Sequence, residues 1–251
     1  MRLNREQSFL EILMNILLWS ERIGFVALAL LITGVFVIRS GQLKIGLPVF
    51  GLGNLLAVLV VIGLVYCLIT LTTSTIGLRA FIVLLLCALP TILTIKLFST
   101  QHLYPGIHDI TTDTVDPPVF HAAPEQRIKS DNSLEIKPES IRLQQEAYRD
   151  LAPITVTLNA AEAQRLATQT AESLNWVIYN NQLESGVLEA FDQTWLLGFK
   201  DDIVIRIRSV DEGSIVDLRS VSRRGRGDIG ANTKRIRAFI ELFKQNSTTA
   251  R

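Results

Sequence analysis

Three long apolar runs fill most of the first hundred residues of this 251-residue chain. Between Arg22 and Lys96 only three residues carry a charge. About 20 apolar residues in a helix are enough to cross the hydrocarbon core of a bilayer. The pattern therefore predicts a transmembrane region over residues 1–97. Its three spans are expected near residues 22–39, 48–71 and 79–97.

The remainder of the chain has the composition of a water-soluble domain. Residues 1–97 carry seven basic and three acidic side chains, whereas residues 98–251 carry 18 basic and 21 acidic ones. A nearly neutral domain gives no electrostatic support for nucleic-acid binding. Both cysteines, Cys67 and Cys87, lie inside the apolar runs. The soluble part therefore has no disulfide framework, no thiol nucleophile and no cysteine-based zinc site.

Basic residues beside the spans predict the orientation in the membrane. Four flank the amino-terminal side and three the opposite side. The four are Arg2, Arg5, Arg22 and Arg79, and the three are Arg39, Lys44 and Lys96. Because positive residues are enriched on the cytoplasmic side, the amino terminus is expected in the cytoplasm. Three crossings then place the carboxy-terminal domain on the opposite side, which is the periplasm if the membrane is a bacterial inner membrane.

The polar residues of the spans indicate an anchor rather than a transporter. No Asp, Glu, Lys or His lies in the core of a span, although ion and proton pathways usually need such groups. The notable polar residues are Asn54 and the threonines 70, 72, 73 and 75. We expect these side chains to serve helix packing or interfacial hydrogen bonding.

The soluble half separates into a lead-in segment with a linker, residues 98–138, and an α+β domain, residues 139–251. Asn159 is the expected N-cap of a helix over residues 160–174, which follows a short strand at 154–158. Four strands are expected next, at 176–179, 186–192, 202–210 and 214–222, with a turn at Asn180-Asn181 between the first two. A last helix is expected over residues 231–244.

This order of elements predicts an antiparallel sheet of about four strands with flanking helices on one face. On the other, open face, Arg206 or Arg208 is expected to lie opposite Asp217 as an ordinary cross-strand pair.

The most distinctive stretch joins the last expected strand to the last expected helix and reads RSVSRRGRGDIGAN over residues 219–232. Glycines let backbone N–H groups face a ligand, and a helix N-terminus attracts anions. The candidate residues for binding an anion or a partner are Ser222, Arg223, Arg224, Arg226, Asp228 and Asn232. The alternative is a structural turn, in which Asp228 caps the helix and the arginines pair with carboxylates such as Asp201 and Asp202. The spacing matches neither a P-loop nor a dinucleotide fingerprint.

A second polar cluster, His108, Asp109 and Asp113, lies just after the membrane region. Its spacing fits no standard zinc or calcium loop, so neither a metal nor another cofactor is expected. We expect a membrane-proximal segment that docks on the domain, and we assign no catalytic residue. The alternative is an envelope enzyme, hydrolase-like, that uses these three residues as acid, base or metal ligand.

Apolar and aromatic residues also gather in the stretch from Trp195 to Asp202. They are expected either to form an exposed apolar lip for binding or, more ordinarily, to pack where a strand begins.

Several stretches together resemble the family known as domain of unknown function 1499. They are GFKDDIVIR at 198–206, VDLRSVSR at 216–223, GRGDIGAN at 225–232 and RIRAF at 235–239. The stretch IHDITTD at 107–113 is similar to the membrane-anchored branch, which has three spans before the domain. The resemblance implies a bacterial envelope protein with its domain outside the cytoplasm, and plastid relatives point to a thylakoid-side location. It implies no activity, catalytic residue or cofactor, and the cysteine-containing motif of one branch is missing here.

The leading hypothesis is a non-enzymatic envelope module for binding or assembly. Its partners would be the lipid bilayer and an anionic envelope ligand or a membrane protein. The alternatives are the envelope enzyme described above and a structural subunit of a larger membrane complex.

Overall fold

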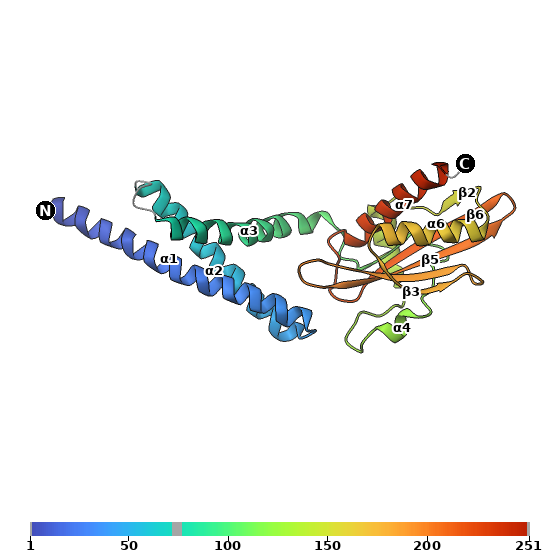
Figure 1. Cartoon of the computed structure of the whole chain (residues 1–251), viewed down its shortest axis with the longest axis horizontal. Coiled ribbons are helices and arrows are strands. Elements are labelled where there is room, and N and C mark those ends of the chain that lie inside the picture. The colour runs from blue at the N-terminus through green and yellow to red at the C-terminus, as the bar shows by residue number, and fades with distance from the viewer. Residues whose placement is uncertain (1, 72–76, 250–251) are drawn as a thin grey trace. The chain divides into compact units, whose positions relative to one another are not determined.

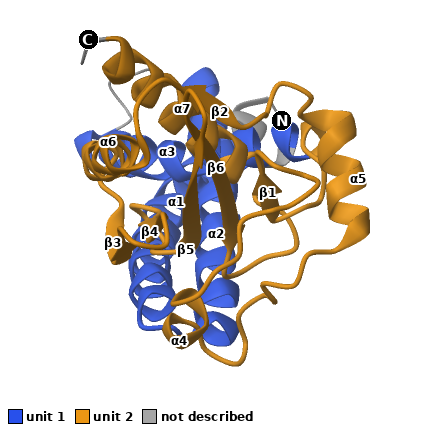
Figure 2. Ribbon diagram, turned by 90° about the vertical axis from the view of Figure 1, so that its right-hand side faces the viewer, with its two compact units in different colours: residues 1–101 blue, residues 102–251 orange. Residues whose placement is uncertain are grey.

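The computed structural model describes residues 2–71 and 77–249 and divides the chain into two compact units. The first unit is residues 1–101 and the second is residues 102–251 (Figures 1 and 2). The expected boundary lay at residue 97, with a separate linker up to residue 138. In the structure, residues 102–138 belong to the same compact unit as the α+β domain.

The first unit consists of α1 (Arg2–Arg39), α2 (Leu43–Thr70) and α3 (Leu78–Thr100). The short 3₁₀ helix η1 (Gln101–Leu103) follows and contains the boundary between the two units. In the described part of the chain, these three helices are long and apolar enough to cross a membrane. Helix α1 is longer than the expected span near 22–39, because the apolar residues before Arg22 continue the same helix. Threonines 72, 73 and 75 lie outside the described residues.

Small residues bring the helices of the first unit close together. A Cβ added to Gly34 would lie 2.7 Å from the backbone of Phe50, and one added to Gly53 would lie 3.0 Å from the carbonyl oxygen of Ala27. Between α2 and α3, the Thr94 hydroxyl donates to the side-chain oxygen of Asn54 at 2.8 Å. The prediction that Asn54 serves helix packing is therefore confirmed.

The second unit is built on a six-stranded antiparallel sheet, which confirms the expected fold class. The strands are β1 (Asp109–Thr111), β2 (Ile154–Val156), β3 (Val177–Gln182), β4 (Val187–Gln193), β5 (Lys200–Val210) and β6 (Gly213–Ser222). Their order is β1-β6-β5-β4-β3, and β2 also pairs with β6. The short strands β1 and β2 lie along one edge of β6, against residues 219–221 and 214–216. Strand β1 was not expected, because three residues give no readable alternation.

Helices α6 (Ala160–Ser173) and α7 (Ala231–Thr249) cover one face of the sheet (Figure 2). Helix α6 begins where the sequence predicts, since the Asn159 side chain and Glu162 form a reciprocal capping box. The core beneath the helices contains the β5 isoleucines 203, 205 and 207 together with Trp176 and Phe239. Shorter helices lie outside this layer: α4 (Ala123–Gln126) and α5 (Pro138–Ala147).

The other face of the sheet is covered, so the expectation of an open face is wrong. Phe120 and Ala123, from the segment before α5, pack on Val204 and Val221. The sheet presents several buried charged side chains on this face, and the same segment supplies many of their partners. A segment that buries both apolar and charged groups of the sheet forms part of the domain core.

The expected turn at Asn180-Asn181 is also wrong. Both asparagines lie inside β3, beside a shift in its register with β4. Asn180 donates to the carboxylate of Glu189, and the side-chain oxygen of Asn181 accepts from Gln164. These side-chain bonds hold the two residues within the strand. The chain turns after Gln182 instead, where Gly186 has a φ of 65°.

Candidate functional site

The covered face of the sheet holds a network of buried ion pairs centred on Asp202. This carboxylate is fully buried and accepts from Arg223 at 2.7 and 3.0 Å. It also accepts from Arg127 at 2.7 Å. Arg223, which the sequence offered as a ligand-binding residue, therefore contributes to the interior. A buried charge without a partner strongly destabilises the folded state. Both arginines therefore stay paired with the Asp202 carboxylate.

A second pair joins the lead-in segment to β6. Arg219 is 2 % exposed, and its guanidinium donates to both carboxylate oxygens of Asp109 at 2.7 and 2.9 Å. The same guanidinium donates to the carbonyl oxygens of Pro118 and Leu134. Asp109 therefore anchors the covering segment to the sheet.

The third member of the second cluster, Asp113, takes part in a separate group of charges. As expected, Arg206 lies directly opposite Asp217 in the register of β5 and β6. Arg206 and Arg208 both donate to Asp217, and they reach Asp113 at 3.4 and 3.3 Å. Asp217 is fully buried, so this pair lies beneath the covering segment rather than in water.

Glu189 is a buried carboxylate that the sequence analysis did not single out. It accepts from the backbone N–H groups of residues 121, 122 and 123 and from Asn180. A signal for it was present, because charged residues lie at even spacings on one face of the neighbouring strands, at Asp202 and Arg206 of β5 and at Asp217 and Arg219 of β6, and Glu189 lies on the same face of β4. A period of two with charges on one face indicates that this face meets polar partners.

The loop between β6 and α7 and the residues that flank it contain all six candidate binding residues, and five of them, all except Arg226, have side chains bonded within the domain. Asp228 caps α7, since its carboxylate accepts from the backbone N–H of Gly230 at 2.9 Å and of Asn232 at 2.7 Å. Burial raises the pKa of Asp228. The Asn232 side chain is fully buried and bonds the Ser220 and Ser222 hydroxyls. The helix N-terminus therefore already holds a carboxylate of the chain itself.

Within the segment Arg224–Gly227, the exposed residues are Gly225 and Arg226. Arg224 pairs with Asp131 at 2.8 Å and is partly buried. Arg226 is exposed, and its guanidinium has no ion pair or hydrogen bond with any described residue. The backbone N–H groups of residues 224–227 likewise donate to no described residue. The arrangement offers a free guanidinium and several amide donors to an anionic ligand.

The two predicted clusters meet at His108 alone. Its imidazole Nδ1 lies 3.3 Å from the carbonyl oxygen of Arg226. Asp109 and Asp113 are instead turned to Arg219 and to the β5 arginines. Among the described residues, no three His, Cys, Asp or Glu side chains form a group that could hold a metal ion.

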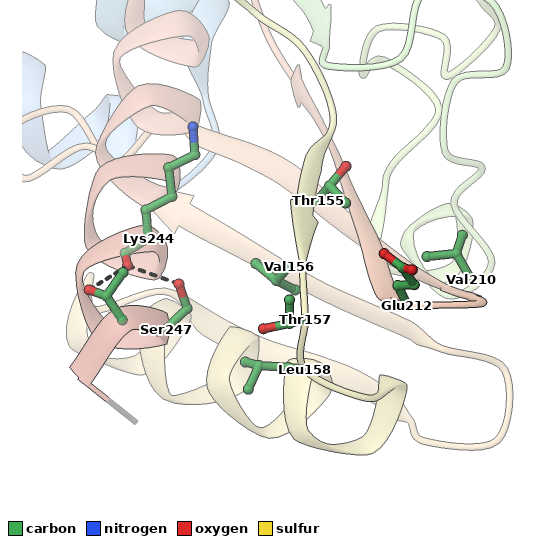
Figure 3. Close-up of a pocket in the computed structure, with 9 residues that line it drawn as sticks. Thr155, Val156, Thr157, Leu158, Val210, Glu212, Lys244 and Ser247 are labelled. Carbon is green, nitrogen blue, oxygen red and sulfur yellow. Dashed lines mark hydrogen bonds between the residues drawn. The ribbon is translucent and has the colours of Figure 1, made fainter. Parts of the chain in front are cut away.

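A hollow of about 460 Å³ lies at the opposite end of the sheet, beside the β5–β6 turn (Figure 3). Strand β2, the turn and the end of α7 form its walls. Lys244 and Glu212 are the charged side chains of its lining. None of the residues predicted from the sequence to form a site lines it.

The family model for "Protein of unknown function (DUF1499)" matches residues 109–243. The chain belongs to the DUF1499 family. The DUF1499 region starts at the first residue of β1 and ends within α7, so it includes the whole sheet and the segment that covers it. The three apolar helices precede it. No curated protein matches this chain.

Proposed function

We propose that this chain is a membrane-anchored, non-enzymatic binding module of the bacterial envelope, and that it holds an anionic group on the loop Arg224–Gly227. The observation that carries this proposal is the exposed Arg226 beside four backbone amides that donate to no described residue. Phosphate and carboxylate groups are the natural ligands of such a set of donors.

The loop is fixed in place by the residues that are not exposed. Asp228 donates its backbone N–H to the Ile107 carbonyl at 3.2 Å and caps α7 with its side chain. On the other side, Arg223 is locked by Asp202, and the Asn132 side chain donates to the carbonyl of Gly225 at 2.8 Å. A loop held at both ends needs little ordering when it binds, which favours affinity.

The loop also lies beside the start of the domain, where Gly227 lies against Gly106.

The location follows from the basic residues beside the spans. They favour a cytoplasmic amino terminus and a periplasmic domain in a bacterial inner membrane. Alkaline phosphatase fused after Arg251 should be active in a bacterial host, and a green fluorescent protein fused there and exported through the general secretion pathway should stay dark. The reverse result would place the domain in the cytoplasm.

The envelope enzyme is the weaker alternative, because the side chains it needs are already engaged. Asp109 accepts two short hydrogen bonds from Arg219, and Asp113 lies against Arg206 and Arg208. Both carboxylates are therefore already held by arginines of the domain.

The test compares two double variants of the full chain in dodecyl maltoside micelles. Arg224→Gln with Arg226→Gln removes the exposed guanidinium of Arg226 and the partly buried one of Arg224, which pairs with Asp131, and leaves Arg223 in place. Arg149→Gln with Arg165→Gln removes the same charge from exposed positions elsewhere in the domain. Binding of inorganic phosphate is measured from the broadening of its phosphorus-31 resonance.

Wild type and the Arg149/Arg165 variant should broaden the phosphate resonance equally. The loop variant should bind at least about tenfold more weakly, because it loses hydrogen bonds to a charged group. Equal broadening by all three proteins, or by none, would refute the anion site.

A further inference from the structure

The hollow beside the β5–β6 turn is a second candidate site, separate from the loop Arg224–Gly227. Its volume of about 460 Å³ lies within the range of ligand pockets, about 300–1,000 Å³. Residues 155–158, from β2 and the segment that follows it, form one wall. Val156 and Leu158 of this wall also pack against the domain core. The hollow therefore has an apolar wall that is held in place by the fold.

The register of the sheet shows which backbone groups of β2 point away from β6. Further along β6, the Leu218 carbonyl accepts from the N–H of Thr112, and the N–H of Ser222 donates to the carbonyl of His108. Residues 218 and 222 thus bond toward the edge that β1 and β2 share. The alternation of an antiparallel ladder gives residues 214 and 216 the same direction, and they lie opposite residues 156 and 154. Thr155, between those two, therefore turns its backbone N–H and carbonyl away from β6.

The outer edge of β2 is open. Thr155 is exposed, and no described strand pairs with this side of β2. Its outward N–H and carbonyl form no hydrogen bond with a described residue. A free strand edge is a template on which an extended peptide can add as a further strand. Because Thr155 itself lines the hollow, such a strand would lie within it.

Two unpaired charges flank this open edge. Figure 3 shows Lys244 of α7 at one side of β2 and Glu212 of the β5–β6 turn at the other. Both side chains are exposed and line the hollow, and neither the ammonium nor the carboxylate has an ion pair or hydrogen bond with a described residue. By contrast, Asp202 and Asp217 inside the sheet are paired with arginines of the chain itself. The charges at the hollow are thus available to a partner.

We propose that the hollow binds an extended segment of a partner protein, which adds to the sheet beside Thr155 and carries an acidic residue next to a basic one. Successive side chains of a strand point to opposite faces, so the acidic residue can meet Lys244 while its neighbour meets Glu212. Backbone hydrogen bonds to Thr155 give affinity, and the two charges select the sequence. The site shares no residue with the loop Arg224–Gly227, so a failure of the phosphate test would leave it standing.

The experiment measures binding of a fluorescein-labelled peptide to the full chain in dodecyl maltoside micelles by fluorescence polarisation. The peptide is capped at both ends and alternates valine and threonine around a central Glu-Lys pair. A second peptide has the same sequence with N-methyl groups on the backbone nitrogens of the central pair, which keeps the charges and prevents strand pairing. Thr155→Pro removes the outward N–H of β2, and Thr155→Val, which keeps this N–H, is the matched control.

The unmodified peptide should bind wild type and Thr155→Val equally. Thr155→Pro should bind it at least about fivefold more weakly, because one backbone hydrogen bond is lost. A proline is tolerated where a strand edge does not use its N–H, so the urea midpoint of this variant should stay near that of wild type. Lys244→Gln combined with Glu212→Gln should also weaken binding at least about fivefold, through the loss of both charged contacts.

The N-methylated peptide gives a test that does not depend on the folding of any variant. It should bind wild type at least about fivefold more weakly than the unmodified peptide does. Equal affinity for the two peptides would mean that the charges alone hold the ligand, as for a small zwitterion, and would overturn the proposal. A wild-type chain that does not bind the unmodified peptide would overturn it as well, whether a second copy of the chain covers the edge or nothing does.

Discussion

Asp202→Asn tests the view that the covered face of the sheet is held together by buried charge. The change keeps the shape of the side chain and removes its charge. Asp202 is fully buried and accepts three short hydrogen bonds from the arginines 127 and 223. Removing one partner of a buried ion pair costs about 3–5 kcal/mol. Both arginines keep bonds to backbone carbonyls, so we expect a loss of about 3 kcal/mol of unfolding free energy.

The assay is urea unfolding in detergent of a full chain that carries Trp19→Phe and Trp195→Phe, so that the tryptophan fluorescence reports on Trp176 alone. This indole is buried against Phe239 and reports on the domain core. With an m-value of about 2 kcal/mol/M, the midpoint should fall by about 1.5 M.

Asp211→Asn is the matched control, because it removes the same charge from an exposed turn. It should move the midpoint by less than about 0.3 M, as expected for a surface charge. If Asp202→Asn shifts the midpoint no more than this control does, the buried network does not stabilise the domain and the reasoning fails.

Two further predictions concern the backbone and the pH dependence. Gly213→Ala should destabilise the domain by about 1–3 kcal/mol, since φ is 134° and a Cβ would clash with the Val156 carbonyl; Gly106→Ala, which meets no atom within 4 Å, should leave the urea midpoint unchanged. Burial raises the pKa of Asp228, so the folded state holds its proton more tightly than the unfolded chain does. Its contribution to stability is therefore greatest below the usual aspartate pKa of about 3.9 and falls as the pH rises through the raised value. The unfolding free energy of wild type minus that of Asp228→Asn should decrease from about pH 3.5 to about pH 7, and a constant difference in urea midpoints would contradict this.

Local patterns of the sequence were sufficient wherever a structure depends on near neighbours. The capping box at Asn159 and the alternation along β5 were both legible, since their partners lie within a few residues. The pairing of Arg206 with Asp217 was legible because a short turn fixes the register of a hairpin. The expected turn at Asn180-Asn181 failed because more distant groups, Glu189 and Gln164, bond those asparagines.

In the candidate site too, the sequence predicts what depends on neighbouring residues, and the fold decides what depends on distant ones. In the sequence, Arg223, Arg224 and Arg226 lie close together, and nothing distinguishes one from another as a binding residue. The fold separates them, since Arg223 is buried with Asp202, Arg224 pairs with Asp131 and Arg226 remains exposed. Which arginine meets a carboxylate depends on residues up to 93 positions away in the chain.

The sequence by itself determined that this chain has three apolar helices and an antiparallel α+β domain, because apolar length and periodicity are properties of consecutive residues. The tertiary structure alone decided that residues 102–138 belong to the domain and that both faces of the sheet are covered. The physical reason is that a buried charge must find its partner in space. Arg219 binds Asp109, which lies 110 positions away in the sequence. A pattern of neighbouring residues cannot predict such a pairing.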